Sequence, residues 1–260
     1  MKLKEKSALI TGAGSGIGKS IAEAFAREGA WVAIADLNFN AAQAVSKEIN
    51  SAGGRAIPTQ MDVANEDQVN AGLEQVVQDF GGVDVLVSNA GIQIINPIID
   101  FSFSDWRKVV AIHLDGSFLT TRAAMRAMIS SGRGGTILYM GSVYSHIAAP
   151  NKSAYVAAKH AILGLAKAVA KEGAKHGIRS NVICPGFVRT PLVEKQIPEQ
   201  AQLLGISEEE VIKNVMLRET VDGEFTSMED VAATAVFLAS FPSKALTGQS
   251  ISVSHGHFMH

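Results

Sequence analysis

The residues best suited to chemistry in this sequence are a tyrosine and a lysine four positions apart, with a serine upstream. Tyr155 and Lys159 would share one face of a helix. A phenol is a poor base at neutral pH because its pKa is about 10, but an adjacent ammonium favours the phenolate and lowers that pKa. Ser142 ends an apolar segment thirteen positions before Tyr155. The three side chains predict proton transfer to or from an oxygen atom of a substrate.

A glycine-rich segment, Thr11–Ser20, is the second feature with a chemical use. It reads TGAGSGIGKS and opens directly into an amphipathic stretch. Glycines permit tight turns and let a phosphate approach main-chain N–H groups at the positive end of a helix. Gly12, Gly16 and Gly18 give the spacing G-x-x-x-G-x-G, and the strict G-x-G-x-x-G is absent. The segment predicts a phosphate cradle, and a turn that serves only helix packing is the alternative.

Asp36 separates two kinds of nucleotide site. Ala13–Ser20 fits a loose Walker A pattern, which would indicate a nucleoside triphosphatase. Asp36, however, ends the next predicted strand, where a dinucleotide site needs a carboxylate to accept hydrogen bonds from a ribose. Its charge repels a 2′-phosphate, and no arginine follows it in residues 37–40. We therefore predict a dinucleotide cofactor, NAD in preference to NADP.

The elements that must position these residues alternate along the chain. One helical face is predicted from Ile17, Ile21, Ala24 and Phe25, and another from Val69, Leu73, Val76, Val77 and Phe80. Apolar runs typical of strands lie at Ala8–Thr11, Trp31–Ala35, Val83–Ser88, Thr136–Gly141, Arg179–Cys184 and Ser250–Val253. Strands that alternate with helices pair in parallel through right-handed crossovers. We expect an α/β fold with one doubly wound parallel sheet.

No linker or low-complexity tract divides the chain, so residues 1–260 are expected to form a single catalytic domain. Residues 190–225 are charged and mostly helical, and Ser207 with Glu210 makes a capping box there. A second capping box, Ser227 with Asp230, begins the last helix. Because ligands bind beyond the carboxyl ends of parallel strands, residues 190–225 are expected to form a lid over the site. A surface excursion with no covering role is the alternative.

Composition excludes several classes of protein. The 260 residues carry 23 Lys and Arg against 25 Asp and Glu, a net charge of −2, which argues against a nucleic-acid partner. With 47% hydrophobic residues the chain can fill a large core, so it is not intrinsically disordered. The lone Cys184 forms no internal disulfide and favours a reducing compartment. Neither a signal peptide nor a membrane-spanning run is apparent, which predicts a cytoplasmic protein.

Taken together, these motifs make the chain resemble the classical short-chain dehydrogenase/reductase family over nearly its whole length. The matching pieces are Thr11–Gly18, Asp62 with Val63, Asn89 to Gly91, Ser142, Tyr155 with Lys159, and Pro185 and Gly186 with Thr190. The resemblance implies a Rossmann-type fold, a homotetramer and hydride transfer to the nicotinamide. It makes Tyr155 the general acid/base, Ser142 the hydroxyl that polarises the substrate oxygen, and Lys159 the residue that holds the ribose and lowers the pKa of Tyr155.

The resemblance also supplies a set of cofactor contacts. These are Gly12, Ser15, Gly16, Ile17, Gly18, Asp36, Asp62, Val63, Asn89, Ala90, Gly91, Tyr155, Lys159, Pro185, Gly186, Val188 and Thr190. One catalytic position departs from the family pattern, since His113 stands where an asparagine is expected to anchor a water of the proton relay. A histidine can bind the same water or relay the proton by changing tautomer. A helix histidine outside the chemistry is the alternative.

Further residues are similar to those of bacterial D-3-hydroxybutyrate dehydrogenases. By that resemblance Gln93, Lys152 and Gln196 hold the substrate carboxylate, alongside Ser142 and Tyr155. Tyr144 replaces a histidine and can still donate a hydrogen bond from its hydroxyl. Phe187 replaces a tryptophan, which leaves room for a slightly larger 3-hydroxy acid. We therefore expect NAD-dependent oxidation of D-3-hydroxybutyrate, or of a close relative, to the 3-oxo acid.

Two other functions stay open: a short-chain reductase for a ketone, sugar alcohol or 3-oxoacyl thioester, and a non-catalytic NAD-binding regulator. The intact Ser142, Tyr155 and Lys159 speak against the regulator. His255, His257 and His260 are read as a polar tail in preference to a metal site, because no carboxylate or cysteine supports them. Cys184 is expected to pack in the core and not to react.

Overall fold

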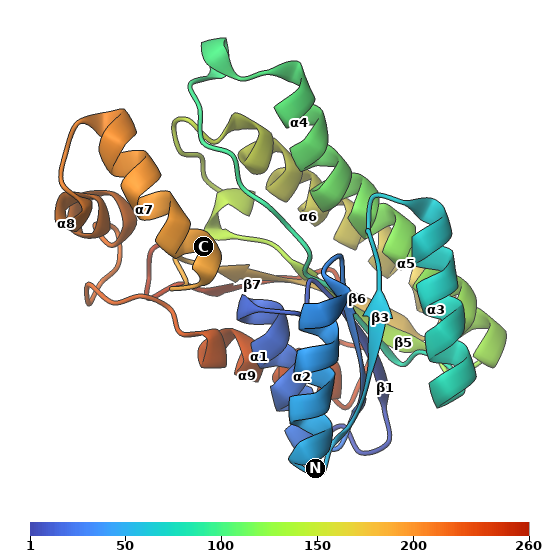
Figure 1. The fold of residues 1–260 in the computed structure, drawn as a ribbon. Coiled ribbons are helices and arrows are strands. Elements are labelled where there is room, and N and C mark those ends of the chain that lie inside the picture. Colours follow the sequence, from blue (N-terminus) through green and yellow to red (C-terminus); the bar gives the residue numbers. More distant parts are fainter. Residues whose placement is uncertain (260) are drawn as a thin grey trace.

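The structure is a computed structural model, and it describes residues 1–259. In them seven strands form one sheet in the order β3-β2-β1-β4-β5-β6-β7, with every neighbouring pair parallel (Figure 1). The strands are β1 (Ser7–Thr11), β2 (Trp31–Asp36), β3 (Arg55–Gln60), β4 (Val85–Ser88), β5 (Gly135–Met140), β6 (Ile178–Pro185) and β7 (Ser250–Val253). The strand order reverses between β1 and β4, which confirms the predicted doubly wound sheet and opens a crevice at their carboxyl ends.

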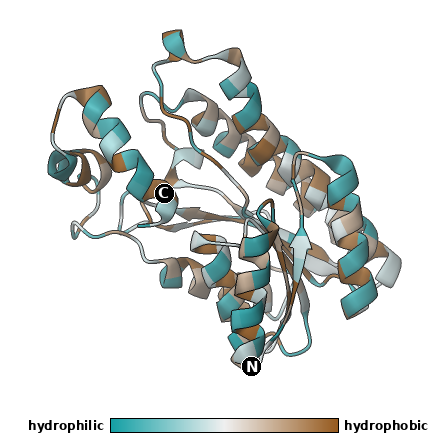
Figure 2. Cartoon of the chain, viewed as in Figure 1, coloured by the Kyte–Doolittle hydropathy of each residue, from teal (hydrophilic) through white to brown (hydrophobic). Residues whose placement is uncertain are grey.

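Helices cover both faces of this sheet (Figure 1). The major helices are α1 (Gly16–Arg27), α2 (Phe39–Ser51), α3 (Glu66–Phe80), α4 (Phe103–Val110), α5 (Gly116–Ser131), α6 (Ser153–Gly173), α7 (Pro191–Leu204), α8 (Glu208–Glu210) and α9 (Met228–Ser240). Residues of α1, α2 and α9 pack in one hydrophobic cluster, and residues of α3, α5 and α6 pack in a second. The two clusters lie on opposite faces of the sheet, and the turns of α2 and α3 are largely hydrophilic in Figure 2.

The edge strand β3 is the one strand that hydrophobic runs did not predict. Its sequence, Arg55 to Gln60, contains Pro58 and no continuous apolar run. Proline has no N–H to donate, so it is tolerated where only one side of a strand is paired. β3 pairs with β2 alone, which explains why Pro58 does not break it.

The predicted helical faces are largely confirmed. Ile21, Ala24 and Phe25 are buried on α1, and Val69, Leu73, Val76 and Phe80 are buried on α3. The prediction was wrong for Val77, which is 38% exposed because it follows Val76 around the helix. Both capping boxes, Ser207 with Glu210 and Ser227 with Asp230, are present.

Residues 190–225 fold into α7, α8 and a π-helical turn, Val211–Met216. Val193 and Ile197 of α7 join Tyr144 and Phe187 in a third hydrophobic cluster. This cluster lies apart from the two that flank the sheet, and it connects residues 190–225 to the loops that follow β5 and β6. Within residues 1–259 no helix combines the length and hydropathy that crossing a membrane requires.

Candidate active site

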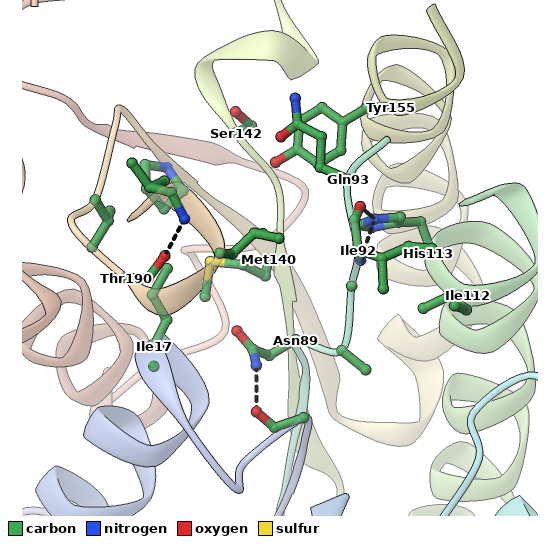
Figure 3. A pocket seen from close by; sticks show the side chains of 18 of the residues that line it. Ile17, Asn89, Ile92, Gln93, Ile112, His113, Met140, Ser142, Tyr155 and Thr190 are labelled. Carbon is green, nitrogen blue, oxygen red and sulfur yellow. Dashed lines mark hydrogen bonds between the residues drawn. The ribbon is translucent and has the colours of Figure 1, made fainter. Parts of the chain in front are cut away.

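A pocket of about 390 Å³ lies at the carboxyl ends of the strands, where the sheet order reverses. It is bordered by the loops after β1 to β6 and by α7. Figure 3 shows Ile17 and Asn89 at one end of the pocket and Ser142, Gln93 and Tyr155 at the other. All the site residues predicted from the sequence line it, apart from Gly18 and Lys152. Its volume is that of a site for a small-molecule ligand.

The glycine-rich loop is fixed by close backbone contacts. Gly12 has φ +62°, and a Cβ on it would lie 2.9 Å from Ala90 Cα. A Cβ on Gly18 would lie 2.3 Å from the carbonyl oxygen of Gly12, so Gly18 packs α1 against the loop and does not line the pocket. Asn89 completes the support, because its Nδ2 donates to the carbonyl oxygen of Thr11 at 2.9 Å. The loop is thus held open at the N-terminus of α1, as a phosphate cradle requires.

Asp36 stands at the rim of the pocket with its carboxylate fixed by the backbone. Its Oδ2 accepts a hydrogen bond from Gly14 N, and its Oδ1 accepts one from Asn38 N, both at 2.9 Å. Each oxygen keeps a lone pair for a further donor. The neighbouring Leu37 is 67% exposed and also lines the pocket. A diol that entered beside the glycine loop would therefore meet a fixed, negatively charged acceptor.

Ser142, Tyr155 and Lys159 lie together at the other end of the pocket. Ser142 follows β5, and its hydroxyl accepts a hydrogen bond from Tyr144 N at 3.2 Å. Tyr155 and Lys159 lie one turn apart on α6, with Lys159 Nζ 5.3 Å from the centroid of the Tyr155 ring. Lys159 Nζ also donates to the carbonyl oxygen of Met140 at 2.5 Å, which anchors it to β5. The predicted triad is therefore assembled.

The pKa of Tyr155 differs from the sequence expectation. Burial raises the pKa of Tyr155 to about 12, and the neighbouring Ser142 hydroxyl lowers it by less. Burial also lowers the pKa of Lys159 to about 7, so the ammonium that was expected to acidify the phenol is itself destabilised. The expected lowering was wrong for the protein alone, because desolvation is the largest influence on both groups.

His113 lies in a π-helical turn, Ala111–Asp115, between α4 and α5. Its Nε2 is 2.7 Å from the carbonyl oxygen of Ile92 and 3.1 Å from Ile92 N (Figure 3). The ring meets Tyr155 edge to face at 5.4 Å between centroids. Burial and the charge of Lys159 lower the pKa of His113 to about 3, so the imidazole is neutral at physiological pH. The Nε2 of His113 is therefore hydrogen-bonded to the main chain of Ile92, in the loop after β4.

This geometry predicts the outcome of His113→Asn. A carboxamide can donate to the carbonyl oxygen of Ile92 and accept from Ile92 N at once, which one nitrogen of a neutral imidazole cannot do. We expect kcat to be kept or raised, with no change in its pH profile between pH 5 and 9, because His113 does not titrate there. Steady-state kinetics across that range make the test. A loss of about tenfold or more in kcat would show a proton-relay role for the imidazole.

The far end of the pocket holds polar groups without partners. Gln196 of α7 is 3% exposed, and within residues 1–259 neither its Nε2 nor its Oε1 is hydrogen-bonded. The Nε2 of Gln93 also has no hydrogen-bond partner in these residues, and Figure 3 shows Gln93 at the same end of the pocket as Ser142 and Tyr155. Buried amides without partners are costly, and these atoms border the pocket, so they are available to hydrogen-bond a ligand.

Lys152 is the N-cap residue of α6, and it lies next to this end of the pocket without lining it. It is 3% exposed, and its Nζ lies 5.1 Å from the ring centroid of Tyr144 and 4.9 Å from that of Phe187. Burial lowers its pKa to about 8, and no carboxylate opposes this shift. The two aromatic faces are thus the main stabilisation of a buried cation.

Sequence reasoning missed the placement of His257. The expectation of a polar tail was wrong for this residue, because its ring packs against Tyr144 and Phe187 at centroid distances of 6.3 and 6.0 Å. His255 instead pairs with Asp222 at 2.6 Å, and His260 lies outside the described residues. Residues 1–259 contain no cluster of three or more groups that could hold a metal. Cys184 is fully buried, and burial raises its pKa to about 11, as a packing role requires.

Comparisons with known proteins agree with this geometry. A family model described as short chain dehydrogenase matches residues 6–201. A D-beta-hydroxybutyrate dehydrogenase of Rhizobium meliloti (strain 1021) is 40% identical over 255 residues, 96% of this chain and 98% of the relative. A 3-oxoacyl-(acyl-carrier-protein) reductase of Thermotoga maritima is 37% identical over 256 residues, 98% of this chain and 99% of the relative.

A solved structure agrees in fold. The crystal structure of a short-chain type dehydrogenase/reductase from Mycobacterium marinum superposes with a TM-score of 0.88 at 36% sequence identity. The match covers 98% of this chain and 96% of that one. Fold, motifs and overall sequence similarity therefore agree on one class of protein.

Proposed function

The chain belongs to the short-chain dehydrogenase family, and we propose that within it the protein oxidises D-3-hydroxybutyrate, or a slightly longer 3-hydroxy acid, with NAD as hydride acceptor. Lys152 carries this proposal: it is a buried cation without a carboxylate partner, and it lies directly behind Tyr144 and Phe187, which line the pocket. A short hydroxy acid has little apolar surface, so its carboxylate must supply most of its binding energy.

The residues present fit a dinucleotide. The glycine loop offers main-chain N–H groups at the start of α1, and Asp36 offers a carboxylate for the adenosine ribose. The adenine ring would lie beside Asp62 and Val63. The rest of the dinucleotide would be bordered by further residues that line the pocket: Asn89 to Gly91, Pro185, Gly186, Val188 and Thr190. When bound, NAD supplies the hydride acceptor and a positive charge on the nicotinamide ring. Asp36 makes NAD preferable to NADP, because a 2′-phosphate would meet its charge.

Tyr155 takes the proton from the substrate hydroxyl during oxidation and returns it in the reverse direction. Ser142 donates a hydrogen bond to the same oxygen and fixes its position. In the protein alone the phenol of Tyr155 is protonated, because burial raises its pKa to about 12. Proton removal therefore becomes easier as the pH rises, and we expect oxidation to accelerate with pH and reduction to slow.

At the acid end, the carboxylate would accept hydrogen bonds from Gln93 and Gln196 and lie near Lys152. Both amide atoms of Gln196 and the Nε2 of Gln93 are buried without hydrogen-bond partners in residues 1–259, and the ammonium of Lys152 lies over the rings of Tyr144 and Phe187. Gln196 belongs to α7, so binding would also draw residues 190–225 over the pocket as a lid. The homotetramer expected from the family stays a prediction.

A 3-oxoacyl thioester is the second candidate, because the Thermotoga maritima relative is named for one. A thioester carries no charge at its carbonyl end and would leave Lys152 unpaired. Initial rates of NADH formation distinguish the candidates. We expect activity with D-3-hydroxybutyrate and longer D-3-hydroxy acids, and none with the L-enantiomer. Activity confined to thioesters or to neutral alcohols would contradict the assignment.

Replacing Lys152 by methionine tests the acid end and predicts opposite effects on function and stability. The KM for the hydroxy acid should rise far more than kcat falls, because the cation binds the ground state and the transition state alike. The protein should also become more stable at pH 7, by about 1–3 kcal/mol, because a buried cation without a carboxylate partner is removed. Steady-state kinetics and thermal denaturation measure the two effects.

The stability effect has a defined pH dependence. The pKa of Lys152 falls from 10.5 in the unfolded chain to about 8 in the folded protein. Burial of this lysine therefore destabilises the fold fully below about pH 8, and the cost disappears as the pH rises to 10.5. The gain in Tm of Lys152→Met should shrink over the same interval. Lys167→Met, at an exposed position of the same helix, is the control and should change neither quantity. An unchanged KM in Lys152→Met would remove Lys152 from the site.

A further inference from the structure

His257 lies beside the acid end of the pocket, although it comes from the C-terminal segment after β7. Its ring contacts Tyr144 at 87° and Phe187 at 57°, the same two aromatic residues that Lys152 covers with its ammonium. Tyr144 and Phe187 line the pocket. Lys152 and His257 do not line the pocket themselves, but both lie against these two rings, and the charge of Lys152 acts on His257.

The ring of His257 has an unused hydrogen-bonding group. Its Nδ1 is buried, and no atom of residues 1–259 is hydrogen-bonded to it. The main chain of the residue is fixed, because His257 N donates to the carbonyl oxygen of Ser254 at 2.9 Å. A rigid backbone with a free, buried ring nitrogen is the arrangement expected of a group that waits for a ligand.

The charges around His257 indicate which ligand fits. Burial lowers its pKa, Glu219 raises it, and the charge of Lys152 lowers it. Tyr144 and Phe187, the other faces packed on it, are uncharged, because burial raises the pKa of Tyr144 to about 12. Because its pKa is lowered from 6.5, the imidazole is mostly neutral at pH 7 and above, and it can donate one N–H beside a cation. An anion accepts from both groups, whereas a second cation would be repelled.

We propose that His257 is a specificity-determining residue whose ring N–H donates a hydrogen bond to the substrate carboxylate beside the ammonium of Lys152. The inference rests on the proposed hydroxy-acid function and adds a fourth donor to Lys152, Gln93 and Gln196. A carboxylate has about four lone-pair positions, so four donors match its capacity. The C-terminal segment thereby becomes part of the acid end of the site.

The test is His257→Phe, which keeps a ring for packing on Tyr144 and Phe187 and removes both nitrogens. The KM for D-3-hydroxybutyrate should rise about tenfold or more, as expected for loss of a hydrogen bond to a charged group, with little change in kcat. The KM for methyl 3-hydroxybutyrate, which lacks the charge, should not change. His257→Gln keeps an N–H donor and should restore most of the affinity. His255→Phe, in the same segment but paired with Asp222, is the matched control and should leave the KM unchanged.

A second measurement separates this inference from the proposed function. Acetate is titrated into the enzyme–NADH complex and its Kd is read from the change in NADH fluorescence. If the wild-type protein does not oxidise D-3-hydroxybutyrate but His257→Phe still weakens acetate binding about tenfold, the proposed function fails and the carboxylate contact stands. If the wild-type protein oxidises the acid and His257→Phe changes neither the KM nor the acetate Kd, the contact is overturned and the function stands.

Discussion

Replacement of Tyr155 by phenylalanine should reduce kcat by about 10²- to 10⁴-fold, the usual contribution of a positioned general acid/base. The change removes one hydroxyl and leaves the ring that packs edge to face against His113 and Tyr144. Ser142 would still bind the substrate oxygen, and Lys159 would still be anchored to Met140. The loss should therefore fall on proton transfer, with the Kd for NADH little changed. Steady-state kinetics and NADH fluorescence titration measure the two quantities.

Tyr139→Phe is a matched control for the loss of a buried phenolic hydroxyl. Tyr139 lies on β5 and is fully buried, and its hydroxyl is 2.7 Å from Oγ1 of Thr121, away from the pocket. Its removal should lower the free energy of unfolding by about 1 kcal/mol and leave kcat unchanged. A Tyr155→Phe protein that folds and keeps more than about a tenth of the wild-type kcat would show that another group moves the proton.

The fold could be predicted wherever local pattern and tertiary role coincide. β1, β2, β5 and β6 are inner strands, and apart from Trp31 and Asp36 at the ends of β2 and Gly135 at the start of β5 their residues are buried. Burial on both faces produces the continuous apolar runs that identified them. β3 was not identified because an edge strand needs neither burial on both faces nor a continuous apolar run. Pro58 is tolerated there because β3 pairs with β2 alone. Its strand character is a property of the sheet and not of the segment.

The same limit applies to the site. Gly12, Asp36, Ser142, Tyr155 and Lys159 could be identified because each follows a strand or shares a helix turn, so the topology alone brings them together. His257 could not be identified from the sequence, because nothing in residues 254–259 indicates that this segment packs against Tyr144 and Phe187. Only a long-range contact gives this histidine a different role from His255.

Burial changed the chemistry expected from neighbours in sequence. The spacing of Tyr155 and Lys159 predicts that the ammonium acidifies the phenol. In the protein alone desolvation penalises both charged forms, so Tyr155 has a pKa of about 12 and Lys159 of about 7. Sequence spacing gives the distance between two groups, whereas the dielectric around them depends on the whole fold. The pair is therefore prepared for proton transfer only when substrate and cofactor charges join it.

Cofactor choice is the second property for which we expect a large effect, and we expect it to depend on Asp36. In Asp36→Ser the ratio of kcat/KM for NAD to that for NADP should fall about 10²-fold or more, because two hydrogen bonds to a charged acceptor and the repulsion of a 2′-phosphate are both removed. The exposed Leu37 beside it allows a second change. Asp36→Ser with Leu37→Arg supplies a guanidinium for the 2′-phosphate, and this double variant should prefer NADP.

Asp36→Asn separates the two contributions, since it removes the charge and keeps one acceptor for the N–H of Gly14 or Asn38. If repulsion dominates, this variant should gain activity with NADP and lose little with NAD. If the ribose hydrogen bonds dominate, it should lose activity with NAD and gain little with NADP. Because Asp36 also fixes the glycine loop, thermal denaturation must show that each variant remains folded before the ratios are compared. An unchanged ratio in folded Asp36→Ser would show that the preference is set elsewhere, and would remove Asp36 from the ribose site.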